Sequence, residues 1–203
     1  MEPVLAASLR ALLRETTTGL PDSEANEFIK EAREWVEEYT GIALIDQTWL
    51  LTLDSWPSGP TPWWDGVRDG YIPDLITDPH YVSIEMPRWP LSSITTVNVY
   101  DENDDATAVV VVDTFFVDTN SLPGRITLKQ NASWPVALRR TNAIEITFVA
   151  GYGAAASDVP SALVRAVKQL AASLYTNRGD GCGDLADMGG VRALLDTYKI
   201  RRV

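Results

Sequence analysis

The chain has 203 residues, of which 45% are hydrophobic and 22% charged, and its formal net charge is −11. This composition is that of an ordinary globular protein and excludes wholesale disorder. A single cysteine, Cys182, excludes an internal disulfide, and a single histidine, His80, leaves too few ligands for a structural zinc site and excludes most histidine-based catalysis. No apolar run approaches the roughly 20 residues of a membrane helix. Glu2 stands where a signal peptide carries positive charge, so we expect no secretion signal.

The charge is unevenly distributed along the chain. Residues 1–120 hold 22 acidic and 6 basic residues, a net charge of −16, whereas residues 121–203 hold 6 acidic and 11 basic ones, a net charge of +5. A protein that grips DNA presents a basic face, and the first 120 residues indicate the opposite. The basic residues of the last dozen positions predict either a solvated tail or a segment that docks on an acidic partner.

Apolar residues recur at helical spacing in the first 41 residues. Val4 to Leu13 predict a first helix, and a second begins after Pro21 and ends at Gly41, a suitable C-terminal cap. The apolar stripe expected to be buried along the second helix consists of Ala25, Phe28, Ile29, Ala32, Trp35, Val36 and Tyr39. The glutamates between them predict a solvated face: Glu24, Glu27, Glu31, Glu34, Glu37 and Glu38.

From Ile42 to Tyr152 the period of the apolar residues changes from helical spacing to two. Segments rich in β-branched and aromatic residues predict strands at 47–53, 81–84, 94–100, 114–117, 125–128 and 144–149. Because these strands follow one another without intervening helices, the sheet should be antiparallel. The Trp- and Pro-rich residues 55–80 predict a loop excursion, since proline cannot donate to a sheet interior.

A helical pattern returns after Ser157 and stops at Arg178–Gly179, followed by a glycine-rich linker and a last short segment, Val191 to Val203. The fold class predicted is α+β, a small helical bundle with an inserted antiparallel β module and a C-terminal tail. The expected divisions are N-terminal helices at 1–41, the β module at 42–152, a core helix at 153–178, and a linker with docking tail at 179–203.

Two motifs resemble ligand sites but lack essential parts. Gly151 to Ala156 lies between a strand and a helix, as in a dinucleotide-binding turn, yet no second parallel strand follows the helix. Asp101, Asn103 and Asp105 imitate the start of a calcium loop, but Val112 stands where a bidentate glutamate is needed. We therefore predict no catalytic residue, no cofactor and no metal.

The seven tryptophans leave an alternative function open. Five of them lie at or near prolines, a pattern that suits the packing of irregular loops and also stacking on sugars: Trp56, Trp63, Trp64, Trp89 and Trp134. The alternative hypothesis is therefore a carbohydrate-binding β module with exposed tryptophans.

A series of motifs resembles the head–tail connector, or adaptor, family of tailed phages, which also occurs in prophages and gene-transfer agents. The most extensive is Ala32 to Gly41 followed by Ala43–Leu44 and Gln47–Trp49. Further matching segments follow in the same order: Leu53–Pro57, Pro90–Val97, Pro123–Ile126, Trp134–Pro135, Asn142–Ile144, Phe148–Gly153, Val159–Leu163 and Leu194–Tyr198. The resemblance covers roughly residues 25–200.

The resemblance implies a non-enzymatic subunit of a ring, typically of twelve copies, located in the virion neck and assembled in the bacterial host cytoplasm. Its implied partners are the portal protein, a stopper or tail completion protein, and other copies of itself. DNA would pass through the lumen as non-specific cargo, and the acidic excess of residues 1–120 would let the duplex slide.

The C-terminal tail is the segment we expect to engage the portal. Its apolar and basic residues form a set too small to fold alone: Leu194, Leu195, Tyr198, Lys199, Ile200, Arg201 and Arg202. We expect residues 191–203 to be poorly ordered before assembly. Deleting them should leave a folded domain that no longer joins portal-bearing heads.

Overall fold

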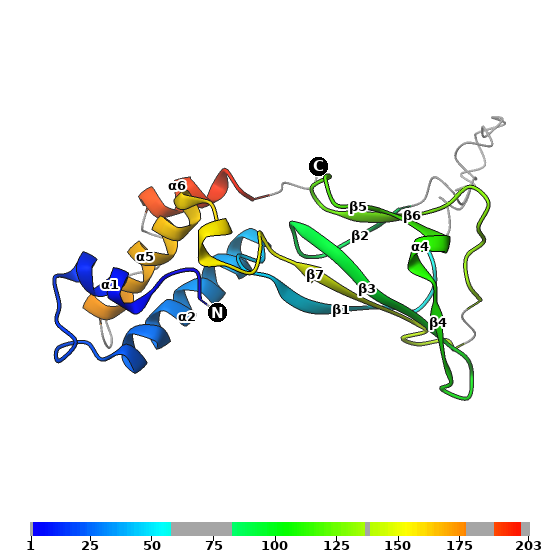
Figure 1. Ribbon diagram of the computed structural model, residues 1–203, viewed down its shortest axis with the longest axis horizontal. Helices are drawn as coiled ribbons and strands as arrows, with labels where there is room; N and C mark the ends of the chain where they lie inside the picture. The colour runs from blue at the N-terminus through cyan, green and yellow to red at the C-terminus, as the bar shows by residue number, and fades with distance from the viewer. Residues whose placement is uncertain (1, 58–82, 137–138, 178–188, 200–203) are drawn as a thin grey trace, which may run out of the picture. The chain divides into compact units, whose positions relative to one another are not determined.

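Figure 1 shows the computed structural model, which describes residues 2–57, 83–136, 139–177 and 189–199. The chain divides into a helical unit, Met1–Gln47 with Gly151–Val203, and a β unit, Thr48–Ala150. Helices and antiparallel sheets occur together, so the predicted α+β class is confirmed. Of the helices in these described ranges, none combines the length and the apolar character that crossing a membrane requires.

The helical unit is built from α1 (Ala6–Leu13), α2 (Asp22–Thr40), α5 (Ser161–Thr176) and α6 (Gly189–Asp196), with a short 3₁₀ turn, η2 (Ala156–Asp158), before α5. α2 begins directly after Pro21 and ends where Gly41 adopts a left-handed φ of 77°. The amide of Gly41 donates to the Glu37 carbonyl at 2.8 Å. The predicted glycine cap is therefore confirmed, because glycine adopts this conformation without steric cost.

α2 and α5 pack along each other although they are far apart in the sequence (Figure 1). The spacing of their apolar residues gives each helix one buried stripe, and Phe28 meets Tyr175 edge to face with ring centroids 6.0 Å apart. The fully buried side chains of this core include Leu9, Leu20, Ile29, Val36, Leu44, Leu163 and Leu170. Burial of these side chains, about 1.5–3 kcal/mol each, holds the unit together.

Glu37 does not belong to the solvated face that the sequence predicted. Its residue exposure is 6%, whereas Glu27 and Glu31 on the same helix are exposed. The Glu37 carboxylate accepts from Arg33 Nη1 at 2.6 Å, from the Leu44 amide at 2.9 Å and from the side-chain amide of Gln47 at 2.7 Å. Helical periodicity cannot reveal such a residue, because two of its three partners, Leu44 and Gln47, lie beyond the end of the helix.

The β unit contains two sheets. The first has the strand order β1 (Gln47–Leu53), β7 (Ile144–Ala150), β3 (Leu91–Tyr100) and β4 (Ala106–Val109). β3 pairs antiparallel with both β7 and β4, with Val97 opposite Ile146 on one side and Val109 on the other. The second sheet has the order β2 (Ser83–Glu85), β6 (Arg125–Leu128) and β5 (Phe115–Asp118), with both pairs antiparallel.

Aromatic rings pack where the second sheet meets the loops of this unit. Trp56 and Trp134 stack with centroids 4.8 Å apart, and each lies 5.8 Å from the ring of Phe115 on β5. Trp56 also donates its indole N–H to the Pro135 carbonyl at 2.6 Å. The loops are therefore fixed to the sheet by aromatic packing, as one reading of the tryptophans predicted.

The strands fall near the predicted positions, with two additions. The uncharged run Ala106–Val112 forms β4 and the start of a one-turn helix, α4 (Val111–Thr114). Neither element was predicted, because the run lacks the alternation of a half-buried strand. The loop excursion predicted at 55–80 lies almost entirely outside the described residues.

The turn between β5 and β6 is organised by the Asp118 carboxylate. It accepts from the Ser121 hydroxyl at 2.6 Å, from the Ser121 amide at 3.1 Å and from Arg125 Nε at 3.1 Å. The bonds from Ser121, with those from Arg125 and Asn120, stabilise the ionised form and lower the pKa of Asp118 to about 2.

We expect a pH titration followed by NMR to place the midpoint of the Asp118 carboxyl near 2, below its ordinary value of 3.8. Because the folded-state pKa is depressed, its stabilising contribution is present above the unfolded pKa and is lost as the pH falls toward 2. Asp118→Asn should remove this part of the acid dependence. A midpoint near 4 would contradict the hydrogen-bonded turn.

Gly151 lies where the chain leaves β7 and returns to the helical unit. Its φ is +154°, and a Cβ added there would lie 2.4 Å from the Asp46 amide nitrogen. Beside it, the Asp46 amide donates to the Gly153 carbonyl at 3.0 Å. Gly151 therefore serves the close approach of two backbone segments, whereas a Cβ at Gly153 would meet the Asp158 side chain.

Candidate functional site

The C-terminal segment is the first candidate surface. α6 buries Val191 and Leu195, which are 5% and 0% exposed. The Tyr39 hydroxyl of α2 donates to the Asp196 carboxylate at 2.6 Å, and Lys199 Nζ lies 4.5 Å from the centroid of the Tyr39 ring. Residues 189–199 are thus attached to α2 and α5 by buried leucine and valine and by a polar contact at the end.

The predicted docking residues are not equivalent in the structure. Leu195 is fully buried, Leu194 and Tyr198 are half-buried, and Lys199 is exposed. Burial, and to a smaller extent Tyr198, raise the pKa of Tyr152. The remaining predicted residues lie outside the described part of the chain: Ile200, Arg201 and Arg202.

That residues 191–203 are poorly ordered before assembly stays a prediction. In the structure, Gly189–Asp196 form α6, and Val191 and Leu195 on its apolar stripe enter the helical core. Deleting the segment would therefore also remove core side chains, so loss of binding in such a truncation would not isolate docking. Of the predicted docking residues, Leu194, Tyr198 and Lys199 are the described ones that stay at least partly exposed.

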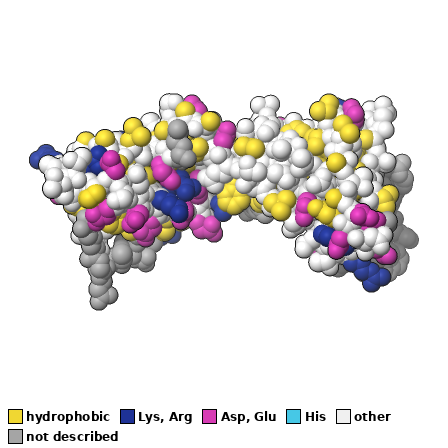
Figure 2. All heavy atoms as spheres, turned by 60° about the horizontal axis from the view of Figure 1, so that its bottom comes forward, with side chains coloured by type: hydrophobic (Ala, Val, Ile, Leu, Met, Phe, Trp, Pro, Cys, Tyr) yellow, Lys and Arg dark blue, Asp and Glu magenta, His cyan; other side chains and the backbone are white. Residues whose placement is uncertain are grey.

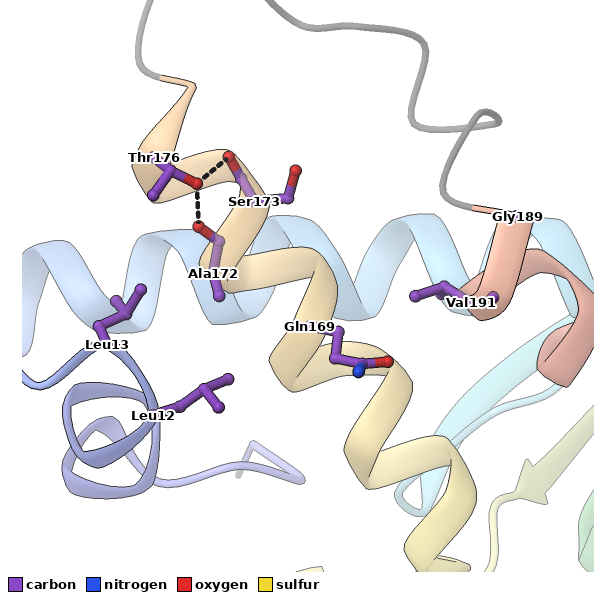
Figure 3. A pocket seen from close by; sticks show the side chains of 9 residues that line it. Leu12, Leu13, Gln169, Ala172, Ser173, Thr176, Gly189 and Val191 are labelled. Carbon is purple, nitrogen blue, oxygen red and sulfur yellow. Dashed lines mark hydrogen bonds between the residues drawn. The ribbon is translucent and has the colours of Figure 1, made fainter.

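A groove lies beside the start of α6, between α1 and α5 (Figure 3). It has a volume of about 540 Å³ and a mainly apolar lining that includes Leu12, Leu13, Ala172 and Val191. Leu12 remains 51% exposed. At one end of the groove the Thr176 hydroxyl donates to the Ala172 and Ser173 carbonyls of its own helix, so it offers little to a ligand.

A second apolar surface lies on the β unit, where β4, α4 and β5 follow one another. We call Val110, Val112, Phe116 and Val117 the α4 patch; they are 61%, 76%, 62% and 36% exposed. The Lys129 ammonium donates to the Val112 carbonyl and lies 5.3 Å from the Phe116 ring centroid. Exposed apolar side chains of this kind are typical of a protein–protein contact.

The motifs that resemble ligand sites have structural roles. Asp101 closes the β3–β4 turn by accepting from the amides of Asn103 and Asp105 at 2.8 and 3.0 Å, and these bonds lower its pKa. β7, before the glycine turn, is antiparallel to β3, whereas a dinucleotide-binding turn needs a parallel unit. Within the described ranges, no three His, Cys, Asp or Glu side chains gather as metal ligands would. His80 and Cys182 lie outside those ranges.

The tryptophans that the structure describes do not form a sugar-stacking platform. Trp49, Trp56, Trp89 and Trp134 in the β unit are all half-buried, and Trp35 on α2 stacks on Tyr39 at 5.2 Å. Arg88 lies over the ring of Trp49 at 4.9 Å. Stacking on a sugar needs an exposed ring face, and these rings are used in packing. Trp63 and Trp64 lie outside the described residues.

Charged side chains on the helices are mixed in sign. On the face shown in Figure 2, acidic side chains are interspersed with basic ones over the helical unit. Individual pairs include Arg33 with Glu2 at 2.8 Å and Lys30 with Glu34 at 3.9 Å. Such a face does not present the continuous basic surface that gripping DNA requires.

An α+β fold whose candidate sites are apolar surfaces is typical of a protein that acts by assembling with others. No family model and no curated protein matches the sequence. Solved structures do match it: a chain in the neck of an empty gene transfer agent particle, computed with C6 symmetry, has a TM-score of 0.77 and 26% identity. That match covers 99% of this chain and 91% of the other.

Two further matches agree. A chain in the virion of the native gene transfer agent particle has a TM-score of 0.72 and 25% identity, over 99% of this chain and 91% of the other. A chain in the native neck, computed with C12 symmetry, has a TM-score of 0.70 and 24% identity over 98% and 92%, which shows the fold. The chain therefore has the fold of a structural component of the neck of a phage-like particle.

Proposed function

We propose that this chain is a head–tail connector subunit, which forms a ring beneath the portal of a phage-like particle and receives a stopper or tail completion protein on its other side. The observation that carries the proposal is the structural match over 99% of the chain and 91% of a gene transfer agent neck chain. A match over both lengths means that the helical and the β units both have counterparts there. The role is structural, and it requires neither a catalytic residue nor a cofactor.

Symmetry and charge support the ring. The matched necks were computed with C6 and C12 symmetry, and twelve copies per ring is the stoichiometry we propose. A net charge of −16 over residues 1–120 would keep DNA phosphates from adhering, so that the duplex passes through the lumen as cargo. We place the ring in the particle neck and its assembly in the host cytoplasm.

The C-terminal segment is the part of the chain that we propose meets the portal. Leu195 and Val191 hold α6 on the helical unit, while Leu194, Tyr198 and Lys199 remain accessible beside it. Ile200, Arg201 and Arg202 continue the same segment, and the two arginines would extend the contact with cationic side chains. Because α6 already attaches the start of this segment to the helical unit, fewer residues have to become ordered when it binds the portal. The loss of conformational entropy on docking is therefore smaller.

Mixing the purified chain with the portal protein of its particle tests this function. The chain is 22.3 kDa, so a ring of twelve bound to the portal adds twelve such masses to the complex. We expect mass measurement and electron microscopy to show a ring on one face of the portal. A chain that neither binds the portal nor forms a ring at any concentration would overturn the proposal.

The contact itself can be tested with Tyr198→Ala and Lys199→Glu in one chain. Loss of an aromatic contact and reversal of an exposed charge should weaken portal binding about tenfold or more, equivalent to at least ~1.4 kcal/mol. Lys30→Glu reverses an exposed charge on α2 and serves as the control, which should bind as the unaltered chain does. The measurement is a titration with the portal followed by light scattering. If the unaltered chain, the double variant and Lys30→Glu bound with equal affinity, the tail would not be part of the interface.

A further inference from the structure

The outer strand β4 and the residues after it form an uncharged, exposed edge. β4 pairs with β3 on one side only, and it is the last strand in the order of its sheet. Ala106, Thr107 and Ala108 are exposed, and the α4 patch continues the surface. We propose that this edge and the α4 patch are the contact with the next copy of the same chain in the ring; the inference rests on the proposed function and names its subunit interface.

An edge of this kind needs a covering partner. Isolated edge strands usually carry lysine, proline or an inward charge, which prevents pairing with other chains. None of the seven residues from Ala106 to Val112 is charged or a proline, and four of them are consecutive valines. A β-branched, neutral, exposed edge is a template for pairing, so in a functional protein it is expected to be covered on assembly.

A groove next to the α4 patch provides room for side chains of the neighbour. Its volume is about 510 Å³, and it lies between β3 on one side and β4, α4 and β5 on the other. Its lining alternates hydroxyl and apolar groups, among them Ser93, Thr95, Val97, Val110 and Val117. A floor of hydroxyls and valines suits a neutral segment of a protein better than a charged one.

The net charge favours this neutral edge as a contact between copies in the proposed ring. Each copy carries a net charge of −11, so two copies repel each other unless they meet through neutral surface. Ala106–Val112 is such a surface, and Lys129 beside it is one of only 17 basic residues in the chain. In a cyclic ring each subunit contacts its two neighbours through two different surfaces. If this edge belongs to one of those surfaces, the neighbouring subunit covers it in every copy.

Two valines of nearly equal exposure make a matched test. Val112 in the α4 patch is 76% exposed, and Val136 elsewhere in the β unit is 74% exposed. Val112→Glu places a negative charge at each contact, and we expect it to reduce the yield of portal-bound rings at least tenfold. Val110→Glu, at a position 61% exposed, should act in the same way, whereas Val136→Glu should assemble as the unaltered chain does.

The readout is the mass of complexes with the portal, with far-UV circular dichroism to confirm folding of each variant. Rings of Val112→Glu and Val110→Glu that form as readily as those of Val136→Glu would overturn the inference. The inference would also be overturned if these two variants formed rings normally but no longer bound a tail protein. The α4 patch would then be the contact with that protein. If the unaltered chain forms no ring, the proposed function fails. This outcome differs from normal ring formation by Val112→Glu and Val110→Glu, which contradicts only the inferred interface.

Discussion

Replacing Glu37 by alanine is expected to lower the free energy of unfolding of the helical unit by about 3–5 kcal/mol. The carboxylate is buried and holds three donors: the Arg33 guanidinium, the Leu44 amide and the Gln47 side chain. Removing it leaves a half-buried guanidinium and a buried amide without this acceptor, and the desolvation of these groups is no longer offset. Chemical denaturation followed by circular dichroism measures the loss.

Glu34 provides the control on the same helix. It lies 3.7 Å from the same arginine, but its side chain is 56% exposed. Exposed ion pairs contribute little, so Glu34→Ala should change the free energy of unfolding by less than about 1 kcal/mol. If the two variants were equally stable, the Glu37 contacts would not stabilise the helical unit.

Leu195→Ala is the second substitution with a large expected effect, a loss of about 2–5 kcal/mol in the free energy of unfolding. Leu195 has 0% exposure and holds α6 on the helical core, so truncation removes apolar contacts and leaves a cavity. Hydrogen exchange should show faster exchange of the α6 amides than in the unaltered chain. Without its anchor, α6 opens at lower cost.

The adjacent Leu194 allows a matched comparison. It is half-buried, so Leu194→Ala removes less buried surface and should cost less stability. The two variants also separate anchoring from docking: Leu195→Ala acts on folding of the segment, and Leu194→Ala acts on a face that a partner can reach. Equal stability of both would mean that α6 does not depend on its buried stripe.

Much of the fold followed from periodicity and from residues that interrupt it. The stripe of α2, its glycine cap and the antiparallel strands were predictable because each depends on short-range spacing. Glu37 was not, since its burial depends on Leu44 and Gln47, which lie beyond the end of the helix. β4 was missed because its strand character comes from pairing with β3, not from alternation in its own sequence.

The candidate surfaces were predictable in part. Residues of the tail stood out by composition, but which of them face the core depends on how α6 lies against α5, and Leu195 proved to be an anchor. The α4 patch could not be predicted as an exposed surface, because a run of valines predicts burial. Its exposure becomes visible only when β4 is seen at the edge of its sheet.

The packing of α2 against α5 has a consequence for synthesis on the ribosome. The β unit, Thr48–Ala150, is continuous in sequence and is synthesised completely before Ser161–Thr176. α2 must therefore wait for its partner helix, and the helical core closes only after the entire intervening segment has been made. We expect the nascent chain to form its sheets first and to acquire its helical core last, with α2 open to chaperones in the interval.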